Sequence, residues 1–306
     1  MANRWWMYQR ERFPVFAHAP LIAAFSLSAV SYSGLIRGAR GLPDWKSCVV
    51  AFLSAFLFFL QLRLADEFKD FEEDSRFRPY RPVPRGLVGL RDLAWVWAGC
   101  IALQLALALW LAPRLIVFLA ITWLYLVLMS KEFFVKRWLK ARPITYMVTH
   151  MAIMPLVDLY TTACDWIPHG YVRPPHGLLW FLLVSFFNGM VIEIGRKIRV
   201  PEDEETGVET YSVLWGRGKA VTVWLAILLV TAVFAFLAAR GISFVTPVVT
   251  ALSTAFVAAA GIAMYFLRGE TAGRGKAIET MSGVWSLVLY LSLGFVPALL
   301  RQWGSR

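Results

Sequence analysis

Three aspartates spaced four residues apart stand at the end of an apolar stretch of the chain. They are Asp66, Asp70 and Asp74, within the segment RLADEFKDFEEDSRFRPYRPVPRG that covers residues 63–86. On a helix that continues the apolar stretch, successive members lie on one face, about 6 Å apart along the axis. Carboxylates this close repel one another unless a cation lies among them. Mg²⁺ suits the arrangement, because it binds one or two carboxylates together with phosphate oxygens.

A second acidic cluster follows another apolar stretch, in the segment NGMVIEIGRKIRVPEDEETGVETYSVLWG over residues 188–216. Glu193 lies near the end of that stretch, and Glu202, Asp203, Glu204 and Glu205 follow Pro201. An acidic run beside a membrane is often only a solvated helix face, and either cluster alone would be read in that way. Two such clusters expected on the same side of a membrane favour a site.

Basic residues accompany both acidic clusters. Arg76 and Arg81 follow the first cluster, in a proline-rich stretch whose stiff backbone would fix the direction of the arginines. Arg196 and Lys197 lie within the second cluster. Carboxylates for a metal ion and cationic side chains for phosphate oxygens are together what a metal-bound diphosphate requires.

The elements that must position these residues are membrane-spanning helices. The chain of 306 residues is 58% hydrophobic and only 17% charged, which is too apolar for a soluble domain. A helix crosses a bilayer with about 20 apolar residues. Stretches near that length cover residues 14–36, 46–64, 92–112, 114–130, 143–162, 178–192, 219–239, 242–267 and 277–300. We therefore expect an all-α integral membrane protein of about nine transmembrane helices, with residues 1–306 forming a single domain.

The distribution of the net charge of +11 argues against a nucleic-acid partner. If the N-terminus is cytoplasmic, most basic residues fall on the cytoplasmic side, as the positive-inside rule requires. Most acidic residues fall on that side as well, which the rule does not predict, and this indicates a site there. We expect a protein of the bacterial plasma membrane, embedded in the lipid bilayer, with its active site on the cytoplasmic side.

The two clusters resemble the motifs of the UbiA superfamily of intramembrane prenyltransferases. The three aspartates followed by RPYRPVPRG are similar to the first motif, N-x-x-x-D-x-x-x-D with an R-P-x-x-x-G-like loop, except that Asp66 replaces the usual Asn. The segment PEDEETGVETYSVLWG is similar to the tail of the second motif, with Gly207, Thr210 and Gly216 in place, although the usual pair of aspartates is not clear.

This resemblance implies nine transmembrane helices around a central cavity and a Mg²⁺-dependent reaction. An allylic isoprenyl diphosphate would ionise, and its prenyl group would pass to an acceptor, typically aromatic or a quinone precursor. The candidate metal ligands are Asp66, Asp70, Asp74, Glu193 and Asp203. The candidate diphosphate contacts are Arg76, Arg81, Lys131, Arg196 and Lys197, with Lys131 as the match to a lysine that follows the fourth helix in the family. The candidate cavity residues are Asn188, Tyr125 and Tyr146.

Other functions remain open at the level of sequence. A terpene cyclase on the same scaffold needs no acceptor, and the departures from both motifs favour it slightly. A transporter would place charges near the membrane midplane, often on inverted repeats, whereas these acids lie at helix ends and no convincing repeat is seen. A purely structural membrane protein is the remaining alternative. His150 and Asp158 are ionisable residues inside an apolar stretch, which makes each a candidate for function.

Overall fold

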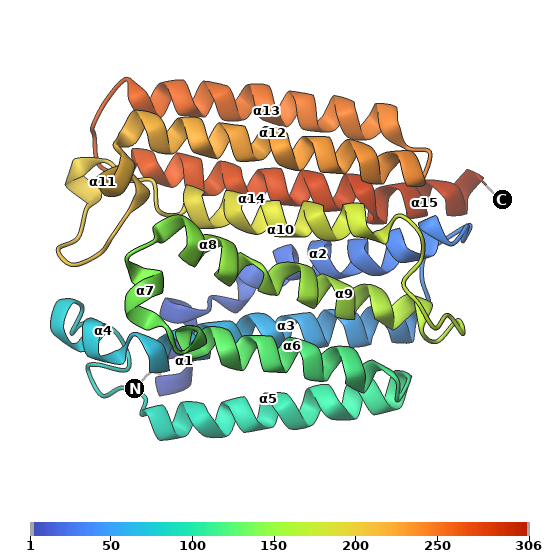
Figure 1. The fold of residues 1–306 in the computed structure, drawn as a ribbon, viewed down its shortest axis with the longest axis horizontal. Coiled ribbons are helices and arrows are strands. Elements are labelled where there is room, and N and C mark those ends of the chain that lie inside the picture. The colour runs from blue at the N-terminus through green and yellow to red at the C-terminus, as the bar shows by residue number, and fades with distance from the viewer. Residues whose placement is uncertain (1–2, 305–306) are drawn as a thin grey trace.

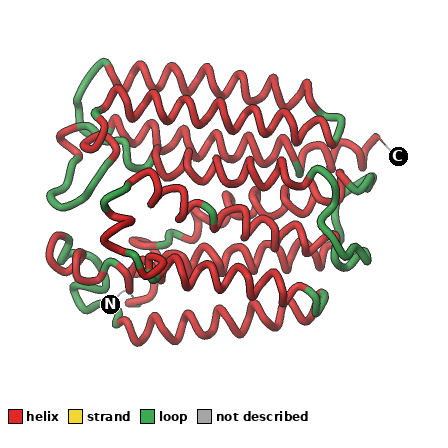
Figure 2. Tube along the Cα trace, in the orientation of Figure 1, coloured by secondary structure: helices red, strands yellow, loops and turns green. Residues whose placement is uncertain are grey.

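The computed structural model describes residues 3–304, which fold as helices joined by loops and contain no strand (Figure 2). Long helices lie side by side as one bundle (Figure 1). The long helices are α2 (Val15–Ile36), α3 (Trp45–Lys69), α5 (Leu90–Leu111), α6 (Leu115–Ser130), α10 (Leu178–Gly195), α12 (Arg217–Gly241), α13 (Val245–Leu267) and α14 (Arg274–Leu293). The bundle is completed by α8 (Pro143–Met151), α9 (Ile153–Trp166) and α15 (Phe295–Gly304).

Each of the nine predicted spans falls on a helix or on a pair of consecutive helices. Among residues 3–304, seven helical segments are long and apolar enough to cross a membrane, with α14 and α15 forming one of them. The 16-residue α6 and each of the separate helices α8 and α9 are shorter than that length, so the count of nine passes is approximate. The first and last described helices, α1 (Arg4–Arg12) and α15, lie at opposite ends of the bundle, as an odd number of passes requires (Figure 1). The predicted class, an all-helical membrane bundle, is confirmed.

The fifth predicted span is divided at Ala152, between α8 and α9. Pro155 explains the break, because it has no N–H to donate to the carbonyl of Met151 and its ring crowds that carbonyl. The break turns α8 away from the line of α9 at the end of the bundle where the N-terminus lies (Figure 1). Side chains of α8 can therefore reach groups that a straight helix would not face.

Short helices gather at this same end, which we call the N-terminal end of the bundle (Figure 1). They are α1 (Arg4–Arg12), α4 (Phe71–Phe77), α7 (Lys136–Lys140) and α11 (Tyr211–Trp215), and the 3₁₀ turns η1 (Glu132–Phe134) and η2 (Pro201–Asp203) lie in the same connections. Both acidic clusters belong to these connections. The fold therefore brings the two halves of the predicted site to one end of the bundle.

The sequence-based expectation of one continuous helix through all three aspartates is wrong. Asp44 caps the start of α3, where its side chain accepts hydrogen bonds from the backbone N–H groups of Lys46 and Ser47. The helix ends at Lys69. Asp70 has φ −101° and ψ 8°, which are not helical, and α4 starts at the next residue. Asp66 and Asp74 consequently lie on different helices and face different partners.

Close packing of α10 against α14 depends on a glycine. A Cβ atom placed on Gly195 would lie 2.1 Å from Oγ of Ser282 on α14, so only glycine fits there. Small residues of this kind let membrane helices approach closely. The contact fixes the end of α10, and with it the position of Glu193 and the basic residues that follow.

Candidate active site

Asp66 and Asp70 converge on one cationic position. The ammonium nitrogen of Lys69 lies 3.6 Å from Oδ1 of Asp66 and 4.0 Å from Oδ1 of Asp70. Burial raises the pKa of Asp70 above its usual range, Lys69 opposes this, and repulsion from Asp66, Asp74 and Glu73 adds to it. Burial therefore disfavours the charged form of Asp70, and any further cation nearby would stabilise that form. About a third of each carboxylate side chain is exposed, so a ligand can reach both.

Lys69 is held by a second contact on the other side of the site. Its ammonium donates a 2.8 Å hydrogen bond to the hydroxyl of Tyr146 on α8, and its nitrogen lies 5.5 Å from the centre of the same ring. Tyr146 reaches α3 because α8 is bent at the break described above. The predicted cavity residue Tyr146 is thus brought to the aspartates, and it positions the lysine between them.

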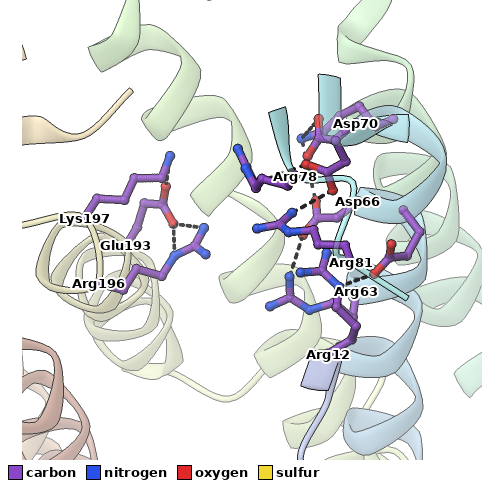
Figure 3. A network of polar contacts seen from close by, with 12 residues as sticks. Arg12, Arg63, Asp66, Asp70, Arg78, Arg81, Glu193, Arg196 and Lys197 are labelled. Carbon is purple, nitrogen blue, oxygen red and sulfur yellow. Dashed lines mark hydrogen bonds and ion pairs between the residues drawn. The ribbon is translucent and has the colours of Figure 1, made fainter. Parts of the chain in front are cut away.

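Asp74 is almost completely buried and lies against two arginines. Its Oδ2 accepts a 2.6 Å hydrogen bond from Arg81, and its Oδ1 lies 3.2 Å from the guanidinium of Arg78. A buried carboxylate requires such partners, because an unpaired charge in this environment is costly. Asp74 therefore fixes the direction of the proline-rich loop, and the loop directs two guanidinium groups back toward the acidic cluster (Figure 3).

Two more arginines enter the cluster from α1 and α3. Arg12 donates a hydrogen bond to the buried Glu67, and Arg63 lies 3.4 Å from Oδ2 of Asp66. Arg63 also interacts electrostatically with Arg12 and with Arg196, so guanidinium groups of both clusters face the same region. Repulsion among them disfavours this arrangement unless acids or a bound anion offset the charge.

The second cluster is an acid held by two bases. Glu193, at the end of α10, accepts a 2.6 Å hydrogen bond from Nε of Arg196, and its other oxygen lies 2.9 Å from Nζ of Lys197. Glu193 raises the pKa of Arg196 well above its ordinary value, so this guanidinium stays charged. Figure 3 shows this group and the first cluster lying on opposite sides of one region, with cationic side chains directed between them.

Loop contacts join the two motifs directly. Tyr80, in the loop after α4, donates a 3.0 Å hydrogen bond to Glu205, in the loop after η2. Gly207 has φ +76°, and a Cβ atom built on it would lie 2.7 Å from the ring of Phe77 on α4. Thr210 is buried and caps α11, while its hydroxyl donates to Glu204. Gly207 therefore lets the second loop pack on the first, whereas Thr210 holds the second loop to the start of α11.

The carboxylates present suit a metal ion that completes its coordination with ligand oxygens. Among residues 3–304 there is no group of three or more Asp, Glu, His or Cys side chains that could hold a metal ion by themselves. Asp66 and Asp70 nevertheless direct oxygens at the same cation, the ammonium of Lys69. Mg²⁺ often uses one or two carboxylates with water and phosphate oxygens, so these two residues fit it, and Asp74, turned to its arginines, fits less well.

Several predicted site residues lie elsewhere. Arg76 is exposed and stacks over the ring of Phe77, and Lys131 is exposed at the end of α6. Asp203 accepts a 2.8 Å hydrogen bond from the backbone N–H of Gly273, at the start of α14. The structure therefore does not bring Asp203 to Glu193. The carboxylate of Asp203 is bonded to a loop N–H, and the carboxylate of Glu193 is paired with two cations.

Two predicted cavity residues have structural contacts. Asn188 is buried between α10 and α14, where its Oδ1 accepts a 3.1 Å hydrogen bond from Ser286. Tyr125 donates a 2.7 Å hydrogen bond to the carbonyl of Thr149 on α8, and its ring packs on Phe133. These bonds hold helices together, and Tyr125 also supports the segment that carries Tyr146.

Sequence reasoning gave no site role to Lys69, Glu67, Arg12, Arg63 or Arg78. The sequence does contain an indication for Lys69, since this residue lies between two of the aspartates and three residues after Asp66. Arg12 had none, because its partner Glu67 is 55 residues away and the contact exists only after α1 folds against α3.

Known proteins resemble this chain in sequence and in fold. Digeranylgeranylglyceryl phosphate synthase of Thermococcus kodakarensis is 26% identical over 271 residues, which cover 87% of this chain and 92% of that protein. The apo structure of a UbiA homologue from Aeropyrum pernix K1 has a TM-score of 0.68 at 12% identity, over 89% of this chain and 96% of that one. A UbiA homologue from Archaeoglobus fulgidus, solved with DMAPP and Mg²⁺ bound, has a TM-score of 0.55 at 13% identity, over 94% and 98% of the two chains.

The structural likenesses establish a shared helical fold, in agreement with the bundle described above. The family assignment comes from the sequence model of the UbiA prenyltransferase family, which matches residues 26–300. That range includes both acidic clusters and nearly all of the bundle. This chain therefore belongs to the UbiA prenyltransferase family.

Proposed function

We propose that this prenyltransferase binds an allylic isoprenyl diphosphate with Mg²⁺ and transfers the prenyl group to an acceptor. The observation that carries the proposal is the convergence of Asp66 and Asp70 on one cationic position. These two residues would hold Mg²⁺, which would neutralise charge on the diphosphate as it leaves. The A. fulgidus relative with DMAPP and Mg²⁺ bound supports this choice of donor and metal.

The basic residues around the carboxylates would bind the diphosphate oxygens. Arg81 is directed by Asp74, and Arg196 and Lys197 are directed by Glu193, so their positions are set before any substrate binds. Fixed cations of this kind stabilise the negative charge that grows on the leaving group as the carbon–oxygen bond breaks. Arg76 and Lys131 are exposed at the same end of the bundle and remain candidates for contacts with the diphosphate.

The prenyl chain would lie among apolar side chains next to the cluster. A groove of about 410 Å³ lies between α1, α3 and α5, lined by residues that include Phe13, Phe56 and Leu64. Tyr8, which also lines the groove, interacts electrostatically with Glu67 and Asp66, so the groove lies close to the acidic cluster. An apolar environment would keep water away from the allylic cation.

For the acceptor, we propose an aromatic compound or quinone precursor, as the resemblance to the family implies. A second candidate is a prenylated glycerol phosphate, for which two observations speak. The T. kodakarensis relative is a digeranylgeranylglyceryl phosphate synthase. The ion pairs of the two clusters contain seven cationic side chains and five acidic ones, which leaves charge for an anion beyond the metal-bound diphosphate. The cations are Arg12, Arg63, Lys69, Arg78, Arg81, Arg196 and Lys197, and the acids are Asp66, Glu67, Asp70, Asp74 and Glu193.

Product analysis tests the proposal. Purified protein in nanodiscs would receive Mg²⁺ and geranyl, farnesyl or geranylgeranyl diphosphate, first without an acceptor and then with a phenolic acid or a monoprenylated glycerol phosphate. Asp70→Asn serves as the inactive control. We expect product only when an acceptor is present. A cyclised terpene formed without an acceptor would establish the cyclase alternative and overturn the proposal.

A further inference from the structure

A histidine with one free ring nitrogen lies beside the acidic cluster. His150, on α8, is only 7% exposed. Its ring stacks on Tyr146 with a centroid distance of 3.8 Å and an interplanar angle of 13°, and the edge of Phe133 packs against it at 6.2 Å. Tyr146 in turn bonds to Lys69, so an unbroken series of contacts connects His150 to Asp66 and Asp70.

The hydrogen bonds of the ring fix its tautomer. Nδ1 lies 2.8 Å from the backbone carbonyl oxygen of Tyr146. A carbonyl oxygen only accepts, so Nδ1 carries the proton and donates it, and the neutral ring then bears its lone pair on Nε2. Nε2 is buried and has no hydrogen-bond partner within the described residues. A buried polar atom left in this way calls for an explanation, because most such atoms are bonded.

Charged groups from three elements face this region. The ring interacts electrostatically with Lys69 and Asp66 of α3 and with Glu193 of α10, and Glu132 of η1 interacts with the neighbouring Tyr146. Both motifs therefore lie around the histidine. An acceptor that reaches the prenyl cation between the two motifs would therefore lie near His150.

Prenyl transfer releases one proton. The bond between C1 of the donor and the diphosphate oxygen breaks, and its electron pair leaves with the diphosphate. The acceptor atom, a hydroxyl oxygen or an aromatic carbon, forms a new bond to C1 and loses its proton. Removal of that proton in the transition state by a positioned side chain typically accelerates a reaction by about 10²–10⁴-fold. Asp66 and Glu193 are engaged with cations, whereas Nε2 of His150 and the carboxylate oxygens of the buried Glu132 have no hydrogen-bond partner within the described residues.

We propose that Nε2 of His150 accepts the proton that the acceptor loses during prenyl transfer. This assignment rests on the proposed function, since it requires an acceptor. Nδ1 keeps its own proton and its bond to the Tyr146 carbonyl throughout, which holds the ring in place as imidazolium forms. The proton then passes to water when the products leave, and the neutral tautomer returns.

His150→Gln tests the proposal, because glutamine keeps a polar side chain but cannot take up a proton. His18→Gln is a matched control, since Nδ1 of His18 also contacts a carbonyl four residues earlier, that of Pro14 at 3.0 Å, and its ring also stacks on an aromatic ring, that of Phe13. We expect His150→Gln to lower kcat for transfer by about 100-fold. Binding of the isoprenyl diphosphate with Mg²⁺, measured by calorimetry, should stay within about threefold of wild type.

A pH profile separates a proton acceptor from a structural residue. Protonated His150 cannot accept a proton, so the wild-type rate should fall as the pH is lowered, and this decline should be absent from the residual rate of His150→Gln. Equal rates for His150→Gln and wild type, or an unchanged acid decline in the variant, would overturn the role of His150. So would a loss of diphosphate binding equal to the loss of rate. If His150→Gln does not fold, His150→Asn undergoes the same measurements.

The outcome for wild type distinguishes failure of this role from failure of the proposed function. If wild type consumes no isoprenyl diphosphate with any acceptor, the proposed function fails, and the role of His150 fails with it. If wild type transfers the prenyl group and His150→Gln does so equally well, only the role of His150 fails. Asp70→Asn should lose both transfer and Mg²⁺-dependent binding of the donor, whereas His150→Gln should lose only transfer.

Discussion

The ammonium nitrogen of Lys69 lies 2.8 Å from the hydroxyl oxygen of Tyr146, and it also lies 3.6 Å from Oδ1 of Asp66 and 4.0 Å from Oδ1 of Asp70. The protein thus supplies a cation of its own at the position that we assign to Mg²⁺. A divalent ion that binds there must share or displace the lysine. The hydroxyl of Tyr146 gives the displaced ammonium a partner on the side away from the carboxylates.

Replacing Lys69 with methionine should therefore strengthen Mg²⁺ binding. Two unit charges 4 Å apart near a protein surface interact by about 4 kcal/mol, and a third of that energy already changes affinity about tenfold. We expect the Mg²⁺ concentration for half-maximal binding of isoprenyl diphosphate to fall by about tenfold, measured by calorimetry at fixed ionic strength.

The control for this change is Lys46→Met, at the opposite end of α3. Lys46 lies over the rings of Trp45 and Trp110, away from both acidic clusters. The Mg²⁺ requirement of this variant should match that of wild type. A Lys69→Met protein that needs as much Mg²⁺ as wild type, or more, would show that the lysine does not compete with the metal.

Two of the three aspartates should respond differently to the same substitution. Asp70 is one-third exposed and contacts Lys69, whereas Asp74 is buried and holds Arg78 and Arg81. Asp70→Asn should lower turnover by at least about 100-fold, with little change in thermal unfolding. Asp74→Asn should also lower the free energy of unfolding by about 3–5 kcal/mol, because two guanidinium groups lose their buried partner.

Thermal unfolding in nanodiscs and turnover, measured on the same preparations, check this contrast. Glu73→Gln is a suitable control, since Glu73 lies beside Asp74 in sequence but makes an exposed ion pair with Lys140. Exposed pairs contribute about 0–1 kcal/mol, so this variant should be close to wild type in both measurements. Equal unfolding behaviour of the Asp70 and Asp74 variants would contradict the separate roles given to them.

The sequence predicted the helical class, the approximate spans and the end of the bundle at which the acidic residues meet. These features follow from local properties, namely runs of apolar residues and charge at their ends. The direction of each carboxylate does not, because it depends on partners far away in sequence. Asp74 turns to Arg81 only because α3 ends at Lys69, and Asp203 turns to Gly273 only because the loop after η2 meets the start of α14. The role of His150 likewise depends on the break at Ala152, which the apolar pattern alone did not reveal.

Removal of divalent ions should abolish turnover reversibly. Mg²⁺ would lie between the carboxylates of Asp66 and Asp70 and the diphosphate oxygens, so without the metal these negatively charged groups would face one another directly. Treatment with EDTA should reduce both turnover and calorimetric binding of the donor to background. Added Mg²⁺ should restore both, whereas an equal ionic strength of NaCl should restore neither. Donor binding of unchanged affinity in EDTA would mean that the arginines and lysines hold the diphosphate unaided.

The contact between the two motif loops can be tested through Gly207 and Phe77. A Cβ atom on residue 207 would lie 2.7 Å from the Phe77 ring, and the left-handed backbone there costs a non-glycine residue about 1–2 kcal/mol. Gly207→Ala should therefore push the second loop away from α4 and lower kcat/KM for the donor by about tenfold or more. Phe77→Ala in the same chain removes the clash but not the backbone strain, so the double variant should recover part of the loss.

Gly216→Ala is the matched control, because Gly216 also has a positive φ, of +80°, but a Cβ atom there meets no atom within 4 Å. If Gly216→Ala loses as much activity as Gly207→Ala, and Phe77→Ala gives no recovery, backbone strain alone explains the effect and the packing of the two loops does not matter for the reaction.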